Sequence, residues 1–255
     1  MLAHATLGQA TQGTIFSGGM SHVYNDVPVW GVVISARCDI SNNKAPVYYY
    51  LPVVKWEDFK KVELPNIIVE SAINSVRKSL KKALEKANLS ASILEVKLSP
   101  EELDVLINGV PTKSQRDALK KNFEHLRNLE KCNRNQDSLL ALCKDTFNTI
   151  FSDLAENKNA SYYLIEDKEA GVLVVRLREL HRISPKFMQS LGGGIQVPFE
   201  EPSTVQSEIS TLAEGDLYMP LYKMESPYME HLIQRYVYQF DRIGVEDFDL
   251  GLLTF

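Results

Sequence analysis

A cysteine and an aspartate, Cys38 and Asp39, follow an apolar run, Val29–Ala36, which we expect to form a buried strand. Polar side chains at the end of a strand are held by a rigid element and exposed by a loop, which favours function. Cys38 can then act as a nucleophile that His181 or His22 activates, with Asp39 orienting the imidazole. The alternative is a small half-buried thiol beside a turn-forming aspartate. The residues alone leave both interpretations open.

A second group of side chains that suit an anion gathers near the end of a later predicted strand. It holds four potential cations: Arg176, Arg178, His181 and Arg182. Guanidinium groups bind phosphate through paired hydrogen bonds, so this strand end can contact a phosphate or an RNA backbone. The alternative is a solvated strand face whose arginines pair with Glu166 and Glu179.

The last predicted helix carries a related polar face, on which His231, Arg235 and Arg242 recur at steps of four and seven residues. Residues at these spacings lie near one side of a helix. A charged partner can dock there. The alternative is the ordinary solvated side of an amphipathic helix, with Glu230 and Asp241 nearby.

The sequence has no recognisable metal or nucleotide motif. Its three cysteines form neither a CxxC pair nor a metal-ligand spacing with the five histidines. The Gly192–Gly194 run lies in neither a GxxxxGK[ST] sequence nor a strand–GxGxxG–helix unit, and it is typical of a flexible hinge. We therefore expect no metal, no cofactor and no disulfide framework.

The composition is that of an ordinary globular protein, with 44% hydrophobic and 24% charged residues in a chain of 255. Its formal charge of -5 gives no global attraction for nucleic acid or anionic lipid, although a local basic face can still contact RNA. The longest apolar run is far shorter than the roughly 20 residues that span a bilayer, and the first residues show no secretory signal. These features predict a cytoplasmic protein without a membrane contact.

Short segments rich in β-branched and aromatic residues predict strands in two parts of the chain. The first part supplies a strand and then a hairpin: Gly13–Ser17, Val29–Ala36 and Val47–Val54. The second supplies a hairpin and then a single strand: Ser161–Asp167, Val172–His181 and Asp216–Lys223. Pro220 cannot donate to a sheet ladder, so we expect this last strand at an edge.

Between the two β-regions the apolar period changes to about 3.6 residues, which predicts helices from Pro65 to about Lys158. The first carries a single apolar stripe: Ile67, Ile68, Ala72, Val76, Leu80 and Leu84. The sequence Ser-Pro-Glu-Glu at 99–102 is a strong helix start, because serine caps, proline suits the first turn and acids favour the positive end. Further helices are expected at about 113–131 and 136–156, and a last one begins at Ser226.

The simplest arrangement of these elements is an α+β fold with one discontinuous domain. Residues 8–60 and 159–255 would form a small bent antiparallel sheet or barrel with a C-terminal helix, and residues 61–158 a large helical insertion. Neither β-region has enough strands to be stable alone. The competing arrangement is two independent α+β domains.

Four N-terminal segments carry a family resemblance: Gly13–Phe16, Val29–Ser35, Asn42–Lys44 and Val47–Val54. They resemble the opening half of the PemK/MazF-like toxins, which are small SH3-like barrels that cleave single-stranded RNA. In that family an arginine precedes the proline before the second strand, and a threonine or serine follows the third. Here Val29 or Asp26 and Val54 or Lys55 stand at those positions, so the cleavage residues do not carry over.

Two motifs at opposite ends of the chain carry a second resemblance. They are Ser-x-x-Cys-Asp at 35–39 and Ser-Pro-Tyr-x-Glu-His-Leu-x-x-Arg at 226–235, followed by Arg-Ile-Gly at 242–244. Together they resemble a group of uncharacterised bacterial proteins associated with anti-phage or other conflict gene clusters. The resemblance implies a bacterial defence context and supplies no reaction. If that group has a site, its matched positions are Cys38, Asp39 and His231, as candidate catalytic residues, with Arg235 and Arg242, which would bind phosphate or a partner.

These observations lead to two functional hypotheses of different classes. The first is a non-catalytic or regulatory component of a bacterial anti-phage or toxin–antitoxin-like system, in which the barrel presents an interaction surface. Its helical insertion would bind a protein partner from the same gene cluster or a second copy of the chain. The second is an RNA- or nucleotide-processing enzyme with Cys38 and Asp39 in the site, where Arg235, Arg242 or His181 holds phosphate.

Overall fold

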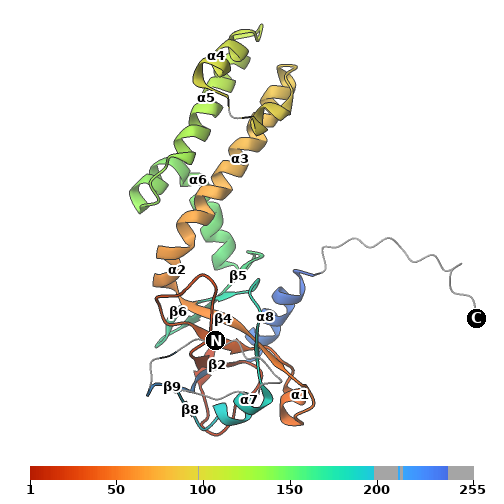
Figure 1. The fold of residues 1–255 in the computed structure, drawn as a ribbon, viewed down its shortest axis with the longest axis vertical. Helices are drawn as coiled ribbons and strands as arrows, with labels where there is room; N and C mark the ends of the chain where they lie inside the picture. The colour runs from red at the N-terminus through yellow and green to blue at the C-terminus, as the bar shows by residue number, and fades with distance from the viewer. Residues whose placement is uncertain (97, 198–211, 213–214, 241–255) are drawn as a thin grey trace, which may run out of the picture. The chain divides into compact units, whose positions relative to one another are not determined.

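The computed structural model of the chain describes residues 1–96, 98–197, 212 and 215–240 (Figure 1). The chain divides into two compact units, Met1–Phe59 together with Leu154–Phe255, and Lys60–Asp153. The first unit holds an antiparallel sheet and the second is helical. The predicted α+β class, with a barrel-like sheet and a large helical region, is confirmed.

The main sheet has eight strands among the described residues, in the order β1-β10-β2-β3-β4-β6-β5, with β7 also paired to β4. Their bounds are β1 Leu2–His4, β2 Thr14–Ser17, β3 Trp30–Val33, β4 Tyr48–Lys55, β5 Tyr162–Asp167, β6 Gly171–Arg176, β7 His181–Ile183 and β10 Pro220–Met224. All of these pairs are antiparallel. A separate two-stranded ladder joins β8 (Ile195–Gln196) to β9 (Leu217–Tyr218).

The long strand β4 is the element about which the sheet curls into a half-barrel. β3 pairs along one edge of β4. On the other edge, Val53–Lys55 pairs with β6 and Tyr48–Tyr50 pairs with β7. After pairing with β4 in β6, the chain therefore turns away and pairs with β4 again in β7. Residues 177–180 connect the two strands.

Both faces of the sheet are covered, because successive residues of a strand point to opposite faces. On β2, Ile15 packs in a core that includes α8 (Tyr228–Val237), whereas Phe16 packs in a second core that includes α7 (Pro185–Leu191). The strands approach closely at Gly31, where a Cβ atom would lie 2.6 Å from ring atoms of Phe16 and Tyr50. Glycine is therefore required in the middle of β3.

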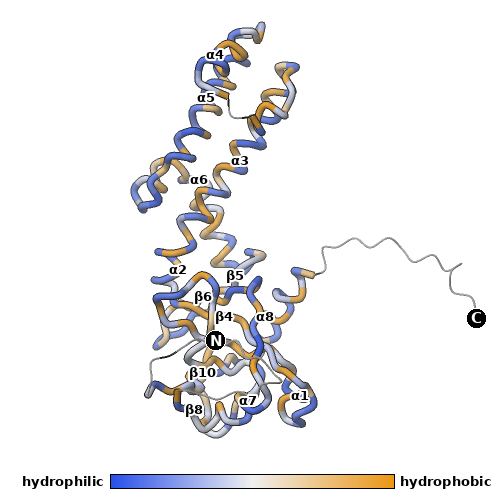
Figure 2. The backbone as a smooth tube through the Cα atoms, viewed as in Figure 1, coloured by the Kyte–Doolittle hydropathy of each residue, from blue (hydrophilic) through white to orange (hydrophobic). Residues whose placement is uncertain are grey.

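The helical unit and its boundaries contain α2 Trp56–Val62, α3 Leu64–Lys86, η1 Ala91–Glu95, α4 Pro100–Asn108, α5 Lys113–Glu130 and α6 Gln136–Ala155. α3 packs along α5 and buries most of its predicted apolar stripe, in keeping with the alternating hydropathy of these helices (Figure 2). Ser99 caps α4 in a capping box with Glu102, as expected. Within the described ranges, every helix is too short or too polar to cross a membrane.

Two strand predictions are wrong in their limits. The strand expected over Val29–Ala36 ends at Val33, and Arg37–Ser41 forms a short helix, α1. Here the Ser35 hydroxyl accepts the N–H of Tyr49 in place of a ladder bond. The strand expected over Val172–His181 is interrupted at residues 177–180, because its two ends pair with different halves of β4.

The edge position predicted for the strand that contains Pro220 is also wrong. β10 lies between β1 and β2, since the N-terminal strand β1 covers its outer side. Pro220 is the first residue of β10 and lies beside a register shift. Both are positions at which a sheet tolerates proline.

Candidate functional site

The turn between β6 and β7 places a carboxylate inside the first unit. Glu179 is only 8% exposed, and its backbone N–H bonds to the carbonyl of Arg176, the last residue of β6. The Arg176 guanidinium forms an ion pair with the Glu179 carboxylate three residues away. The predicted pairing of these two residues is confirmed, but in a buried site and not on a solvated strand face.

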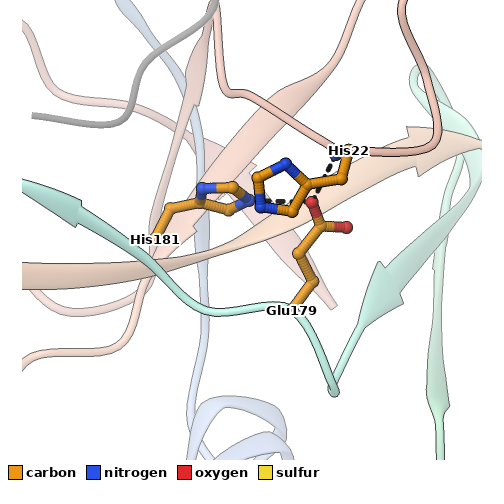
Figure 3. A group of neighbouring side chains, drawn as sticks. All are labelled: His22, Glu179 and His181. Carbon is orange, nitrogen blue, oxygen red and sulfur yellow. Dashed lines mark hydrogen bonds and ion pairs between the residues drawn. The ribbon is translucent and has the colours of Figure 1, made fainter.

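The loop between β2 and β3 supplies two further donors to the same carboxylate. The Ser21 hydroxyl donates to Glu179 Oε2 at 2.9 Å, and the backbone N–H of His22 donates to Oε1 at 2.6 Å. Arg176 also donates to the Ser21 hydroxyl at 3.0 Å. We call Ser21, His22, Arg176, Glu179 and His181 the Glu179 site, and Figure 3 draws three of them, His22, Glu179 and His181.

His181, the first residue of β7, is fully buried and completes the Glu179 site. Its Nε2 lies 2.9 Å from Glu179 Oε1, and because a carboxylate accepts, Nε2 carries the proton in this hydrogen bond. Tyr50 stacks on the imidazole at a centroid distance of 5.3 Å. The exposed ring of His22 lies on another side, with its centroid 5.1 Å away. The His22 and His181 rings both lie beside the Glu179 carboxylate (Figure 3).

The Glu179 site offers two kinds of chemistry. As a hydrogen-bonded cluster, each carboxylate oxygen receives two donors, so the buried charge is fully satisfied. As a ligand set, it offers one atom from each of His22, Glu179 and His181, all within 4.8 Å of one another. Two imidazoles and one carboxylate suit divalent transition metals. In the described part of the chain, this is the one group of three or more potential ligands.

Sequence reasoning missed most of this site. Spacing could have suggested the pair Glu179 and His181, which stand two residues apart, but His22 is more than 150 residues away in the chain. No local pattern connects the two segments. The expectation of no metal rested on the cysteines and on local motifs, neither of which enters this cluster.

The predicted Cys38–Asp39 pair lies on α1, at a different place in the first unit. Cys38 is exposed, and its thiol donates to Asp39 Oδ1 at 3.7 Å. The Asp39 backbone carbonyl accepts the Tyr48 hydroxyl at 3.2 Å. Burial, and then the charge of Asp39, raise the pKa of Tyr48. Neither His181 nor His22 is hydrogen-bonded to the thiol.

The predicted residues of the last helix are engaged elsewhere. His231 Nδ1 lies 3.2 Å from the hydroxyl of Tyr163, whose pKa is raised by burial. Arg235 donates through Nη2 to the carbonyls of Lys158 and Asn159, at 2.8 and 3.1 Å. Arg182 is exposed on β7, opposite Tyr49 of β4. Arg242 lies outside the described residues.

Arg235 also takes part in a small polar cavity of about 70 Å³. The cavity is lined by Ala160, Arg178, Arg235, Tyr238 and Gln239. Two of these residues carry buried nitrogens that have no hydrogen-bond partner among the described residues, Nε of Arg235 and Nε2 of Gln239. The structure therefore brings together Arg178, from the cationic group near the end of β6, and Arg235, from the polar face of the last helix. The sequence did not predict that these two arginines lie close together.

Comparison with family models, with curated proteins and with solved structures finds no match. The resemblances to PemK/MazF-like toxins and to defence-associated proteins therefore stay predictions. Function has to be inferred from the geometry of the sites.

Replacing Glu179 by glutamine is expected to lower the free energy of unfolding by about 3 kcal/mol, because it removes the buried charge that pairs with Arg176 and turns one acceptor oxygen into an NH2 group that faces other donors. Urea unfolding followed by circular dichroism measures the change. The matched control is Glu169→Gln, since Glu169 is an exposed partner of His4 and should change stability by no more than about 0.5 kcal/mol. Equal effects of the two substitutions would contradict the assigned role of Glu179.

Proposed function

We propose that this chain is a non-catalytic binding component of a bacterial defence or toxin–antitoxin-like system. The supporting observation is that its candidate catalytic side chains have separate structural partners. The Cys38 thiol is hydrogen-bonded to the side chain of its neighbour Asp39, and the His231 ring is hydrogen-bonded to the Tyr163 hydroxyl. A cysteine nucleophile is commonly activated by an imidazole within hydrogen-bond reach, and in the described part of the chain the Cys38 thiol is hydrogen-bonded to the Asp39 carboxylate and to no histidine.

The helical unit offers a surface on which a protein partner can bind. Val96 and Val105 are 59% and 75% exposed. A groove of about 470 Å³ lies between η1, α4, α5 and α3, with an apolar floor that includes Leu103 and Phe123 and with Arg127 among its charged residues. Exposed apolar side chains beside charged ones are typical of protein-binding surfaces. The partner in this proposal is a protein encoded beside this chain, whose apolar side chains fill the groove.

Co-expression of the full chain with each product of the adjacent genes tests this function, with native mass spectrometry as the readout. We expect a stable complex with one of them, weakened about tenfold or more by Val96→Glu, because Val96 lines the groove and is exposed. Val237→Glu is the matched control, because Val237 is an exposed valine of the first unit. Cys38→Ser should leave the complex intact.

The proposal is contradicted if the chain stays a monomer in co-expression with each of the adjacent gene products. Equal loss of binding in Val96→Glu and Val237→Glu would also count against the helical surface. Loss of cellular toxicity or of protection against phage in a folded Cys38→Ser variant would instead support an enzyme.

A second candidate function, binding of a phosphate-bearing ligand such as a nucleotide or an RNA end, is favoured by the Arg178–Arg235 cavity. Buried donors without partners are costly, and each calls for an explanation such as a water or an ion. A phosphate group would supply several acceptor oxygens, and guanidinium groups bind it in paired hydrogen bonds. The cavity of about 70 Å³ has room for such a group.

Fluorescence anisotropy with a short single-stranded RNA, either 5′-phosphorylated or 5′-hydroxyl, tests this second function. We expect preference for the phosphorylated end, competition by inorganic phosphate, and about tenfold weaker binding in Arg178→Gln, which loses one paired contact. Arg134→Gln is the control, because Arg134 is exposed in the helical unit. Equal affinity for both RNA ends, or no effect of Arg178→Gln, would contradict a phosphate site.

A further inference from the structure

We propose that His22, Glu179 and His181 bind one divalent transition-metal ion of the zinc or iron class. The proposal goes beyond the binding function above and does not depend on it. It starts from a ligand set of two imidazoles and one carboxylate, whose ligand atoms lie within 4.8 Å of one another. That donor combination is one that zinc and non-haem iron sites use.

The distances already present fit an ion between Glu179 and His181. Glu179 Oε1 and His181 Nε2 are 2.9 Å apart. Two ligands that each lie about 2.1 Å from one metal are about 3.0 Å apart at the right angles of an octahedral site and about 3.4 Å apart in a tetrahedral one, so small shifts bring these two atoms to either geometry. The ion takes the place of the proton on Nε2, which moves to Nδ1 or is released to solvent, because a ligating nitrogen must be unprotonated. Glu179 Oε1 and His181 Nε2 can therefore both bind one ion with only small shifts of the buried side chains.

The third ligand comes from the solvent side. The His22 side chain is exposed, so its ring can turn about its own side-chain bonds toward the ion at no packing cost. Its backbone is already fixed beside the carboxylate by the hydrogen bond from the His22 N–H to Oε1. Water fills the remaining coordination positions on that open side.

The other members of the Glu179 site act as the outer shell that a metal site needs. Arg176 and Ser21 occupy Oε2, which leaves Oε1 directed at the two imidazoles. Outer-shell hydrogen bonds of this kind orient a ligating carboxylate. Because Arg176 already neutralises the carboxylate, the site carries no net negative charge, and its affinity should be moderate.

A metal at this position would connect the β2–β3 loop to β7, two segments far apart in the sequence. An ion that binds the folded chain and not the unfolded one raises stability in proportion to its occupancy. The inferred role is therefore a clip that holds the loop on the half-barrel. Its signature is a metal-dependent rise in the unfolding temperature.

Titration of the metal-free full chain with Co²⁺ tests the site, with its visible absorption as readout and displacement by Zn²⁺ as a second measurement. All proteins carry Cys38→Ser, because that exposed thiol can bind soft metals itself. We expect one equivalent of Co²⁺, an absorption band that Zn²⁺ removes, and a higher unfolding temperature with Zn²⁺. His22→Ala should weaken binding about tenfold or more, whereas His4→Ala should not.

His4 is a matched control because it is also an exposed histidine of the first unit, paired with an exposed glutamate. His22→Ala removes a solvent-exposed ring and keeps the backbone donor to Glu179, so we expect it to fold, as circular dichroism can verify. Absence of a band at one equivalent would overturn the proposal. So would equal binding by the parent and His22→Ala, or equal losses in His22→Ala and His4→Ala.

Discussion

One buried carboxylate, that of Glu179, constrains the first unit of this protein. A charge removed from water is tolerated only when it is paired and hydrogen-bonded. Glu179 meets this condition with an arginine, a hydroxyl, a backbone N–H and an imidazole N–H. These donors come from the β2–β3 loop, the end of β6 and the start of β7. The same contacts that satisfy the charge therefore fix three segments to one another.

The curl of the sheet depends on the turn between β6 and β7, which contains Glu179. β4 pairs with β6 along Val53–Lys55 and with β7 along Tyr48–Tyr50, so the chain must turn between the two strands. Glu179 lies in that turn and faces inward. His181 follows at once in β7, buried under Tyr50, with its Nε2 at the carboxylate. A structural requirement of the half-barrel thus creates the cluster that we infer to bind metal.

Local patterns in the sequence predicted the helical unit well, because its helices depend on short-range periodicity and capping. The stripe through Ile68 and Leu80 and the Ser99 capping box are both present. The sequence predicted the strands but not where each one ends. The turn at 177–180, for example, arises because β6 and β7 pair with different halves of β4, which no local pattern shows. The contact between His22 and Glu179 could not be predicted, because it joins residues brought together only by the sheet. Cys38 and Asp39 were singled out for a strand end that is in fact a short helix.

Hydrogen–deuterium exchange at the His22 amide tests most directly the claim that Glu179 fixes the β2–β3 loop. In the native chain this N–H donates to Glu179 Oε1 at 2.6 Å, so it should be protected although the His22 side chain is exposed. In Glu179→Ala, which removes the acceptor oxygen, its protection should fall sharply, while the Tyr50 amide of β4 stays protected. A His22 amide that exchanges freely in the native protein, or equally slowly in both proteins, would contradict the account.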